Sequence, residues 1–190
     1  MMNDLLRQSR TASNRAPKTL FVIVGVVMLI ALALLLLERR PGYGVYYGIA
    51  KLTGSPVDVG PIKFETLTRH ATPNDALVCP LNLCRNTRPD SVAHTYDLSP
   101  DDLLARLKAV ALAEPNVSEL YCARECGEIA RFVQYSRLMR FPDTVDIAMF
   151  PTDGGRATLA IYSRSLIGRH DSGVNTARAK RWLVTLERGL

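Results

Sequence analysis

The sequence predicts an α+β fold: an antiparallel sheet of about four to six strands with two main helices packed on one face, preceded by a single transmembrane helix. Three observations predict it. An apolar run spans residues 20–37, the segment 129–165 reads as three strands joined by two turns, and amphipathic helical patterns cover 100–113 and 176–188. Because each amphipathic helix must bury its apolar stripe against another layer, a sheet covered by helices is the expected arrangement.

The apolar run sets the expected organisation of the chain. As a helix it would rise about 27 Å, close to the thickness of a bilayer core, and charged residues and Pro41 end it. A cleaved signal peptide is the alternative, but its hydrophobic stretch is shorter and a small-residue cleavage site follows it. The expected divisions are a polar basic arm (1–18), a transmembrane helix (19–38), a connector (39–61) and an α+β domain (62–190).

In the body of the chain, IKFETLT at 62–68 predicts a weak strand, and the Pro-rich stretch 71–91 predicts an irregular loop. Residues 91–97 predict a strand that leads into the helix at 100–113. Ser99 is placed to cap this helix, Pro100 suits its first position, and two aspartates complement the helix dipole.

The second half predicts a short strand near 119–124, then strands at 129–141, 144–150 and 156–165. Turns at Pro142-Asp143 and Asp153-Gly154-Gly155 separate the last three, which therefore form an antiparallel meander. A final helix follows, with Asn175 as the expected cap and an apolar stripe of Ala179, Trp182, Leu183 and Leu186.

The end of the chain carries a signature of polar residues and glycines: Ser163, Arg164, Ser165, Gly168, Asp171, Gly173, Asn175 and Arg178. This pattern, S-R-S-x-x-G-x-x-D-x-G-x-N-x-x-R, resembles that of a bacterial family called domain of unknown function 1499, over about residues 60–190. A second pattern, Tyr135-Ser136-Arg137 with Phe141, fits more loosely. The resemblance implies a fold and frequent secretion or membrane attachment, and it implies no established reaction.

The signature also marks a candidate anion-binding corner at residues 163–178. A helix N-terminus attracts anions, and arginines nearby strengthen that attraction. The candidate ligands are Arg164, Arg169, His170, Asn175 and Arg178. The alternative, which the residue types favour, is structural: Asp171 would pair with Arg164 or Arg178, and Asn175 would only cap the helix. Gly168 and Gly173 would then supply backbone angles that other residues resist.

Four cysteines lie in the body of the chain, at Cys79, Cys84, Cys122 and Cys126. An even number in an oxidising compartment predicts disulfides, and four cysteines allow three pairings. We expect one bridge, or two, tying the 79–84 loop to the 122–126 segment. A tetrahedral zinc site is the alternative, although the spacings are not the familiar ones.

These features give an expected location and set of partners. More Lys and Arg precede the apolar run than follow it closely, which predicts a cytoplasmic N-terminus and a periplasmic C-terminal domain at the bacterial inner membrane. The expected partners are the lipid bilayer, other membrane proteins and possible lipid ligands. Nucleic acid is excluded because the net charge of +6 is spread over the chain and forms no concentrated basic footprint.

The sequence carries no nucleophile elbow, no zinc-protease helix and no phosphate-binding loop, and we expect no cofactor and no metal. The predicted role is that of a non-enzymatic, membrane-anchored accessory or interaction subunit of a membrane or envelope complex. The alternative is a module that binds a lipid or other apolar ligand, with the 163–178 corner holding an anionic head group. An uncharacterised enzyme is the third hypothesis.

Overall fold

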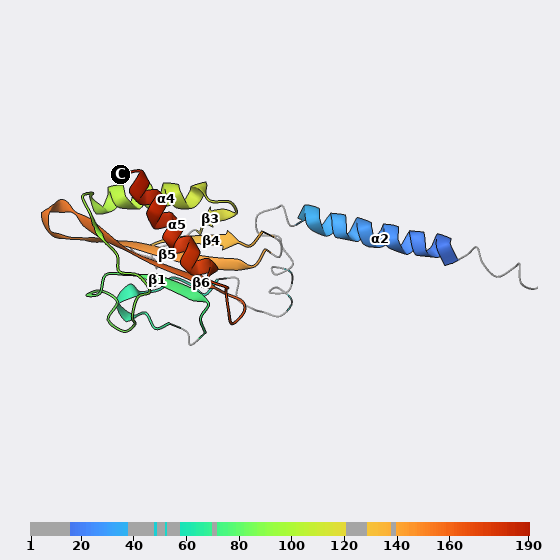
Figure 1. Ribbon diagram of the computed structural model, residues 1–190, viewed down its shortest axis with the longest axis horizontal. Coiled ribbons are helices and arrows are strands. Elements are labelled where there is room, and N and C mark those ends of the chain that lie inside the picture. The colour runs from blue at the N-terminus through green and yellow to red at the C-terminus, as the bar shows by residue number, and fades with distance from the viewer. Residues whose placement is uncertain are drawn as a thin grey trace, which may run out of the picture. The chain divides into compact units, whose positions relative to one another are not determined.

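The computed structural model describes residues 16–37, 48, 52, 58–69, 72–120, 129–137 and 140–190 (Figure 1). The chain divides into two compact units, Met1–Val45 and Tyr46–Leu190.

The first unit contains one described helix, α2 (Ala16–Leu37). Among the described residues, no helix combines the length and the apolar character that crossing a bilayer requires. The predicted transmembrane helix at 19–38 is therefore wrong.

The described residues of the second unit form a six-stranded sheet in the order β1-β6-β5-β4-β3, with β2 also paired to β6. Every pairing between these strands is antiparallel, so the antiparallel sheet predicted from the sequence is present. The strands are β1 (Asp75–Val78), β2 (Thr95–Tyr96), β3 (Val117–Glu119), β4 (Ile129–Tyr135), β5 (Pro142–Pro151) and β6 (Ala157–Ser165).

Two helices, α4 (Pro100–Ala113) and α5 (Val174–Arg188), lie together on one face of the sheet (Figure 1). Their apolar stripes pack on a core of strand residues, and Phe132 of β4 meets Trp182 of α5 edge to face, with ring centroids 5.9 Å apart. The predicted cap of α4 is confirmed, because the Asp102 backbone N–H donates to Ser99 Oγ at 3.1 Å.

The opposite face of the sheet is covered by irregular chain. A second core cluster joins Leu77, Ala148 and Tyr162 of the strands to Phe64 and Leu67. The weak strand predicted at 62–68 is wrong: its centre forms a short 3-10 helix, η1 (Phe64–Thr66). Because both faces of the sheet are covered at its centre, β1 is buried at every position and β6 over its first seven residues.

The predicted meander of β4, β5 and β6 is confirmed by continuous antiparallel pairing, but the turn predicted at Pro142-Asp143 is wrong, because both residues belong to β5 and pair with the end of β4. The turn between β5 and β6 is a 3-10 turn, η3 (Asp153–Gly155), in which Gly154 and Gly155 have φ of 73° and 74°. These positive angles explain the two glycines. By contrast, β1 lies within the stretch predicted as loop, and the strand predicted at 91–97 is reduced to β2.

Candidate functional site

The sheet separates the arginines of the predicted anion corner. Ser163 and Arg164 are neighbours on β6, and successive side chains of a strand point to opposite faces. Ser163 therefore lies on the helix face, where Arg178 Nη1 donates to its Oγ at 2.7 Å. Arg164 lies on the other face, where its Nη2 donates to the carbonyl oxygen of Gly60 at 2.9 Å. The two guanidinium groups thus do not converge on one site.

On the helix face, Ser163, Asn175 and Arg178 form a buried hydrogen-bonded cluster. Ser163 Oγ donates to Asn175 Oδ1 at 2.6 Å, and Arg178 Nη1 donates to the same oxygen at 2.6 Å. Arg178 also forms an ion pair with Asp143 at 2.7 Å and donates from Nε to Gln134. The charge of Arg178 is therefore balanced by Asp143 of β5, and the predicted pairing with Asp171 is wrong.

Asp171, rather than Asn175, caps helix α5. Its carboxylate accepts from the backbone N–H groups of Gly173 at 2.9 Å and Asn175 at 2.8 Å. Gly173 is the N-cap residue, with φ of 77°, and Asn175 lies inside the helix. The prediction of Asn175 as cap is therefore wrong. Burial alone would raise the pKa of Asp171, but the hydrogen bonds from Asn175 and Gly173 outweigh it and hold the pKa below its usual value.

The remaining signature residues complete the same region. Asn175 Nδ2 donates to Ser165 Oγ at 2.9 Å and to the Asn74 carbonyl at 3.0 Å. Gly168 has φ of 88°, so it supplies the backbone angle that the sequence predicts for it. Arg169 and His170 are exposed on the loop before α5. An anion site at this corner stays a prediction, and the contacts of Arg164, Asn175 and Arg178 favour a structural role.

Sequence reasoning missed a second charged cluster, on the face opposite the helices. Arg131 of β4 is 3% exposed and Asp146 of β5 is fully buried, and Arg131 Nε donates to Asp146 Oδ1 at 2.6 Å. Arg131 also donates two parallel hydrogen bonds to the Asp58 carboxylate, at 2.8 Å and 2.7 Å. Arg164 Nη2 lies 3.7 Å from Asp146 Oδ2. Two arginines thus meet two carboxylates in this cluster.

The pKa values in this cluster follow from burial and pairing. The hydrogen bond from Arg131 lowers the pKa of Asp58, against the opposing effect of burial. Burial raises the pKa of Asp146, while Arg131 and Arg164 oppose that rise. The sequence signal that could have revealed this cluster is TVDIAMF, in which Asp146 stands among buried apolar residues. A carboxylate at this position faces water only if the second face of the sheet is open.

The cysteines adopt a pairing that differs from the one expected. Cys79 and Cys84 form a disulfide with each other across a sequence separation of 5. The prediction that the 79–84 loop is tied to the 122–126 segment is wrong for these two cysteines. The Cys79–Cys84 disulfide also excludes these two cysteines as zinc ligands, because a metal is bound by thiolates and not by a disulfide. Cys122 and Cys126 lie outside the described residues.

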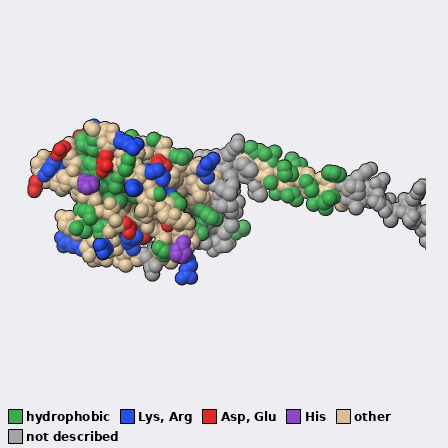
Figure 2. Space-filling model, in the orientation of Figure 1, with side chains coloured by type: hydrophobic (Ala, Val, Ile, Leu, Met, Phe, Trp, Pro, Cys, Tyr) green, Lys and Arg blue, Asp and Glu red, His purple; other side chains and the backbone are tan. Residues whose placement is uncertain are grey.

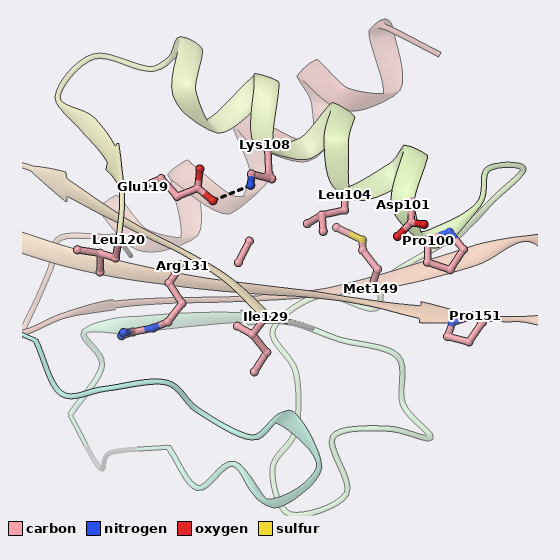
Figure 3. A pocket seen from close by; sticks show the side chains of 11 residues that line it. Pro100, Asp101, Leu104, Lys108, Glu119, Leu120, Ile129, Arg131, Met149 and Pro151 are labelled. Carbon is pink, nitrogen blue, oxygen red and sulfur yellow. Dashed lines mark ion pairs between the residues drawn. The ribbon is translucent and has the colours of Figure 1, made fainter. Parts of the chain in front are cut away.

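A pocket lies beneath α4, between this helix and the ends of β3, β4 and β5 (Figure 3). We call it the α4 pocket; its volume is about 520 Å³. Its wall includes the apolar residues Leu104, Leu120, Ile129, Ala130 and Met149.

Four charged residues also line the α4 pocket: Asp101, Lys108, Glu119 and Arg131. Lys108 of α4 and Glu119 of β3 form an ion pair at 2.6 Å. Figure 3 shows the guanidinium of Arg131 directed away from α4, toward the charged cluster on the other face. Apolar and charged residues therefore share the lining of the pocket, and the Lys108–Glu119 ion pair joins α4 to β3 across it.

A space-filling view shows green apolar side chains interspersed with charged ones over the visible face of the described domain (Figure 2).

Comparison with curated proteins found no match. A family model described as "Protein of unknown function (DUF1499)" matches residues 61–186, which contain all six strands, α4 and most of α5. The chain therefore belongs to the DUF1499 family.

Proposed function

We propose that the domain is a non-enzymatic binding module that takes an apolar or amphiphilic small molecule in the α4 pocket. The observation that carries the proposal is the pocket itself. Its volume of about 520 Å³ lies within the range of about 300–1,000 Å³ that small-molecule sites occupy. Its lining combines apolar side chains with charged ones, and in small-molecule sites apolar burial supplies affinity while polar groups orient the ligand.

The charged side chains of the pocket favour an amphiphile over a purely apolar ligand. Lys108 and Glu119 neutralise each other, and their side chains remain 35% and 40% exposed. Asp101, at the start of α4, is exposed as well. A ligand with its apolar part against Leu104 and Met149 would therefore keep its polar end near these groups and near solvent.

The proposal places the ligand at the α4 pocket rather than at the 163–178 corner. At the corner, Arg178 is 3% exposed and is already paired with Asp143. Arg164 is 11% exposed and donates to Thr144 and Gly60. Displacing these partners would leave buried polar groups without hydrogen bonds, which costs about 1–3 kcal/mol for each group. The accessory-subunit role stays a prediction.

The test is to purify the full-length protein gently and to identify bound small molecules and proteins together by mass spectrometry. The informative variant is Leu104→Glu, which puts a charge into the apolar wall of the pocket. The matched control is Leu112→Glu, on the same helix, where the leucine is 48% exposed and does not line the pocket. Circular dichroism establishes that both variants fold.

We expect a small amphiphile to accompany the unsubstituted protein and the Leu112→Glu variant, and to be absent from Leu104→Glu. Equal retention by all three proteins would overturn the proposal, because the ligand would then lie elsewhere. A stoichiometric protein partner with no small molecule would also overturn it, and would favour the accessory-subunit role.

A further inference from the structure

We infer that the loop closed by the Cys79–Cys84 disulfide docks the domain on the surface of an anionic lipid bilayer, without crossing it. This inference is independent of the α4 pocket and of the proposed function. It is drawn from the exposure of two apolar side chains at this loop and from the two arginines that accompany them, all within the described residues 72–120.

The disulfide loop presents Leu81 to solvent from a fixed base. Cys79 and Cys84 are bonded to each other, and both are buried in the core cluster on the face of the sheet opposite the helices. Between them, the backbone N–H groups of Leu83 and Cys84 donate to the carbonyl oxygen of Pro80, at 3.1 Å and 3.4 Å. Leu81 itself is 66% exposed. Because both ends of the loop are already fixed, this leucine can bind another surface with little further loss of conformational entropy.

Val92 adds a second exposed apolar side chain beside the disulfide loop. The Cys79 backbone N–H donates to the carbonyl oxygen of Ser91 at 3.1 Å, and the Ala93 N–H donates to the carbonyl oxygen of Cys79 at 3.4 Å. These two hydrogen bonds place Val92 next to the start of the loop, and Val92 is 50% exposed. Leu81 and Val92 therefore lie on either side of Cys79 along the surface.

Arg85 and Arg88 supply positive charge at the same loop. Arg85 directly follows the disulfide, and its Nε donates to the carbonyl oxygen of Asn82 at 3.2 Å. Both arginines are exposed, and neither forms an ion pair with another described residue. The nearby carboxylate of Asp90 is already paired with Arg69 at 3.0 Å. Figure 2 shows Lys and Arg side chains along the lower left margin of the domain, the region into which the chain runs after β1 in Figure 1.

The small apolar area favours a lipid surface over a protein partner. A stable protein interface takes about 800 Å² from each partner, whereas this loop exposes two large apolar side chains, Leu81 and Val92. A bilayer demands no matching shape: apolar side chains enter the boundary between head groups and acyl chains, and each arginine near an anionic surface raises affinity about fivefold. Docking of this kind is reversible.

The experiment introduces a tryptophan into the loop and measures its contact with lipid. Trp182 is the single tryptophan of the chain and is fully buried, so a quencher carried by lipid reports on the introduced indole. Leu81→Trp is the probe. Leu112→Trp, which replaces a 48% exposed leucine of α4, is the matched control. The full-length proteins are titrated with vesicles of equal parts phosphatidylglycerol and phosphatidylcholine, with or without bromine on the acyl chains, once circular dichroism establishes that both variants fold.

We expect brominated vesicles to quench the fluorescence of Leu81→Trp and to leave that of Leu112→Trp unchanged. Adding Arg85→Gln and Arg88→Gln to the probe should raise the lipid concentration for half-maximal quenching by about tenfold or more. No quenching of Leu81→Trp, or equal quenching at both positions, overturns the inference. Quenching that the arginine substitutions leave unchanged also overturns it, because the loop would then not recognise an anionic surface.

Discussion

Arg131 of β4 and Arg164 of β6 each donate a hydrogen bond to the carbonyl oxygen of Gly60, both at 2.9 Å. The two arginines lie on either side of β5, where Asp146 is paired with Arg131. Residues 58–60 are thereby held on the face of the sheet opposite the helices. Charge pairing, and not only apolar packing, holds the covering chain in place.

Removing the side chain of Arg131 should therefore lower the free energy of unfolding of the domain. We expect Arg131→Met to destabilise the domain by about 3–5 kcal/mol, because the fully buried Asp146 would lose its hydrogen-bonded partner and keep only Arg164, at 3.7 Å. Urea unfolding followed by circular dichroism measures the loss. Arg181→Met is the matched control: Arg181 pairs with Glu114 but is 51% exposed, so its loss should cost less than about 1 kcal/mol. Equal losses of unfolding free energy in the two variants would contradict this prediction, because they would show that removing Arg131 leaves no costly buried charge on Asp146.

The stability of the domain should also depend on Asn175, for a different reason. Asn175→Ala removes an amide that bonds Ser163, Ser165 and Asp171, so the buried Ser163 hydroxyl loses its acceptor and Ser165 Oγ loses the hydrogen bond from Nδ2. We expect a loss of at least about 2 kcal/mol in the free energy of unfolding. Thr176→Ala, at the next and exposed position of α5, provides the baseline. A difference of less than about 0.5 kcal/mol between the variants would contradict the cluster.

The cap of α5 predicts a pH dependence. The pKa of Asp171 is lowered in the folded state, so its contribution to stability is present above its ordinary value of 3.8 and is lost as pH falls through the lowered folded value. The stability difference between the unsubstituted protein and Asp171→Asn should thus shrink between neutral pH and about pH 2. Urea unfolding at a series of pH values measures it. A difference that stays constant across this range would mean that the charge of Asp171 does not contribute.

The disulfide gives a prediction that is independent of the charged clusters. Proteolysis without reductant should yield a peptide pair, or a looped peptide, linked through Cys79 and Cys84. For a loop this short, replacing both cysteines with alanine should cost about 2 kcal/mol. Recovery of either cysteine linked to Cys122 or Cys126 would contradict the bridge.

Local signals in the sequence predicted the elements whose boundaries depend on neighbouring residues. Helix α4 was predictable because Ser99, Pro100 and Asp102 each act on the backbone within one turn. The β5–β6 turn was predictable because two adjacent glycines satisfy its positive angles. Strand β1 was not, because its four residues stand in a stretch rich in turn formers and become a strand by pairing with β6.

The candidate site was harder to predict because its chemistry depends on distant contacts. Gly60 and Arg164 are 104 positions apart in the sequence, and Asp58 and Arg131 are 73 positions apart. No local pattern brings such groups together. The grouping of Arg164 with Arg178 failed for a simpler reason: residues close in sequence were assigned to one corner, although a strand places neighbours on opposite faces.

That alternation on β6 has a thermodynamic consequence. Ser163 and Arg164 are adjacent, yet they share no hydrogen-bond partner across the sheet. Double-mutant cycles should therefore give a small coupling energy between Ser163 and Arg164, and a large one between Ser163 and Arg178, fifteen positions along the chain. Within this one family signature, residues that are adjacent in sequence are thus expected to be weakly coupled, and residues that are distant in sequence strongly coupled.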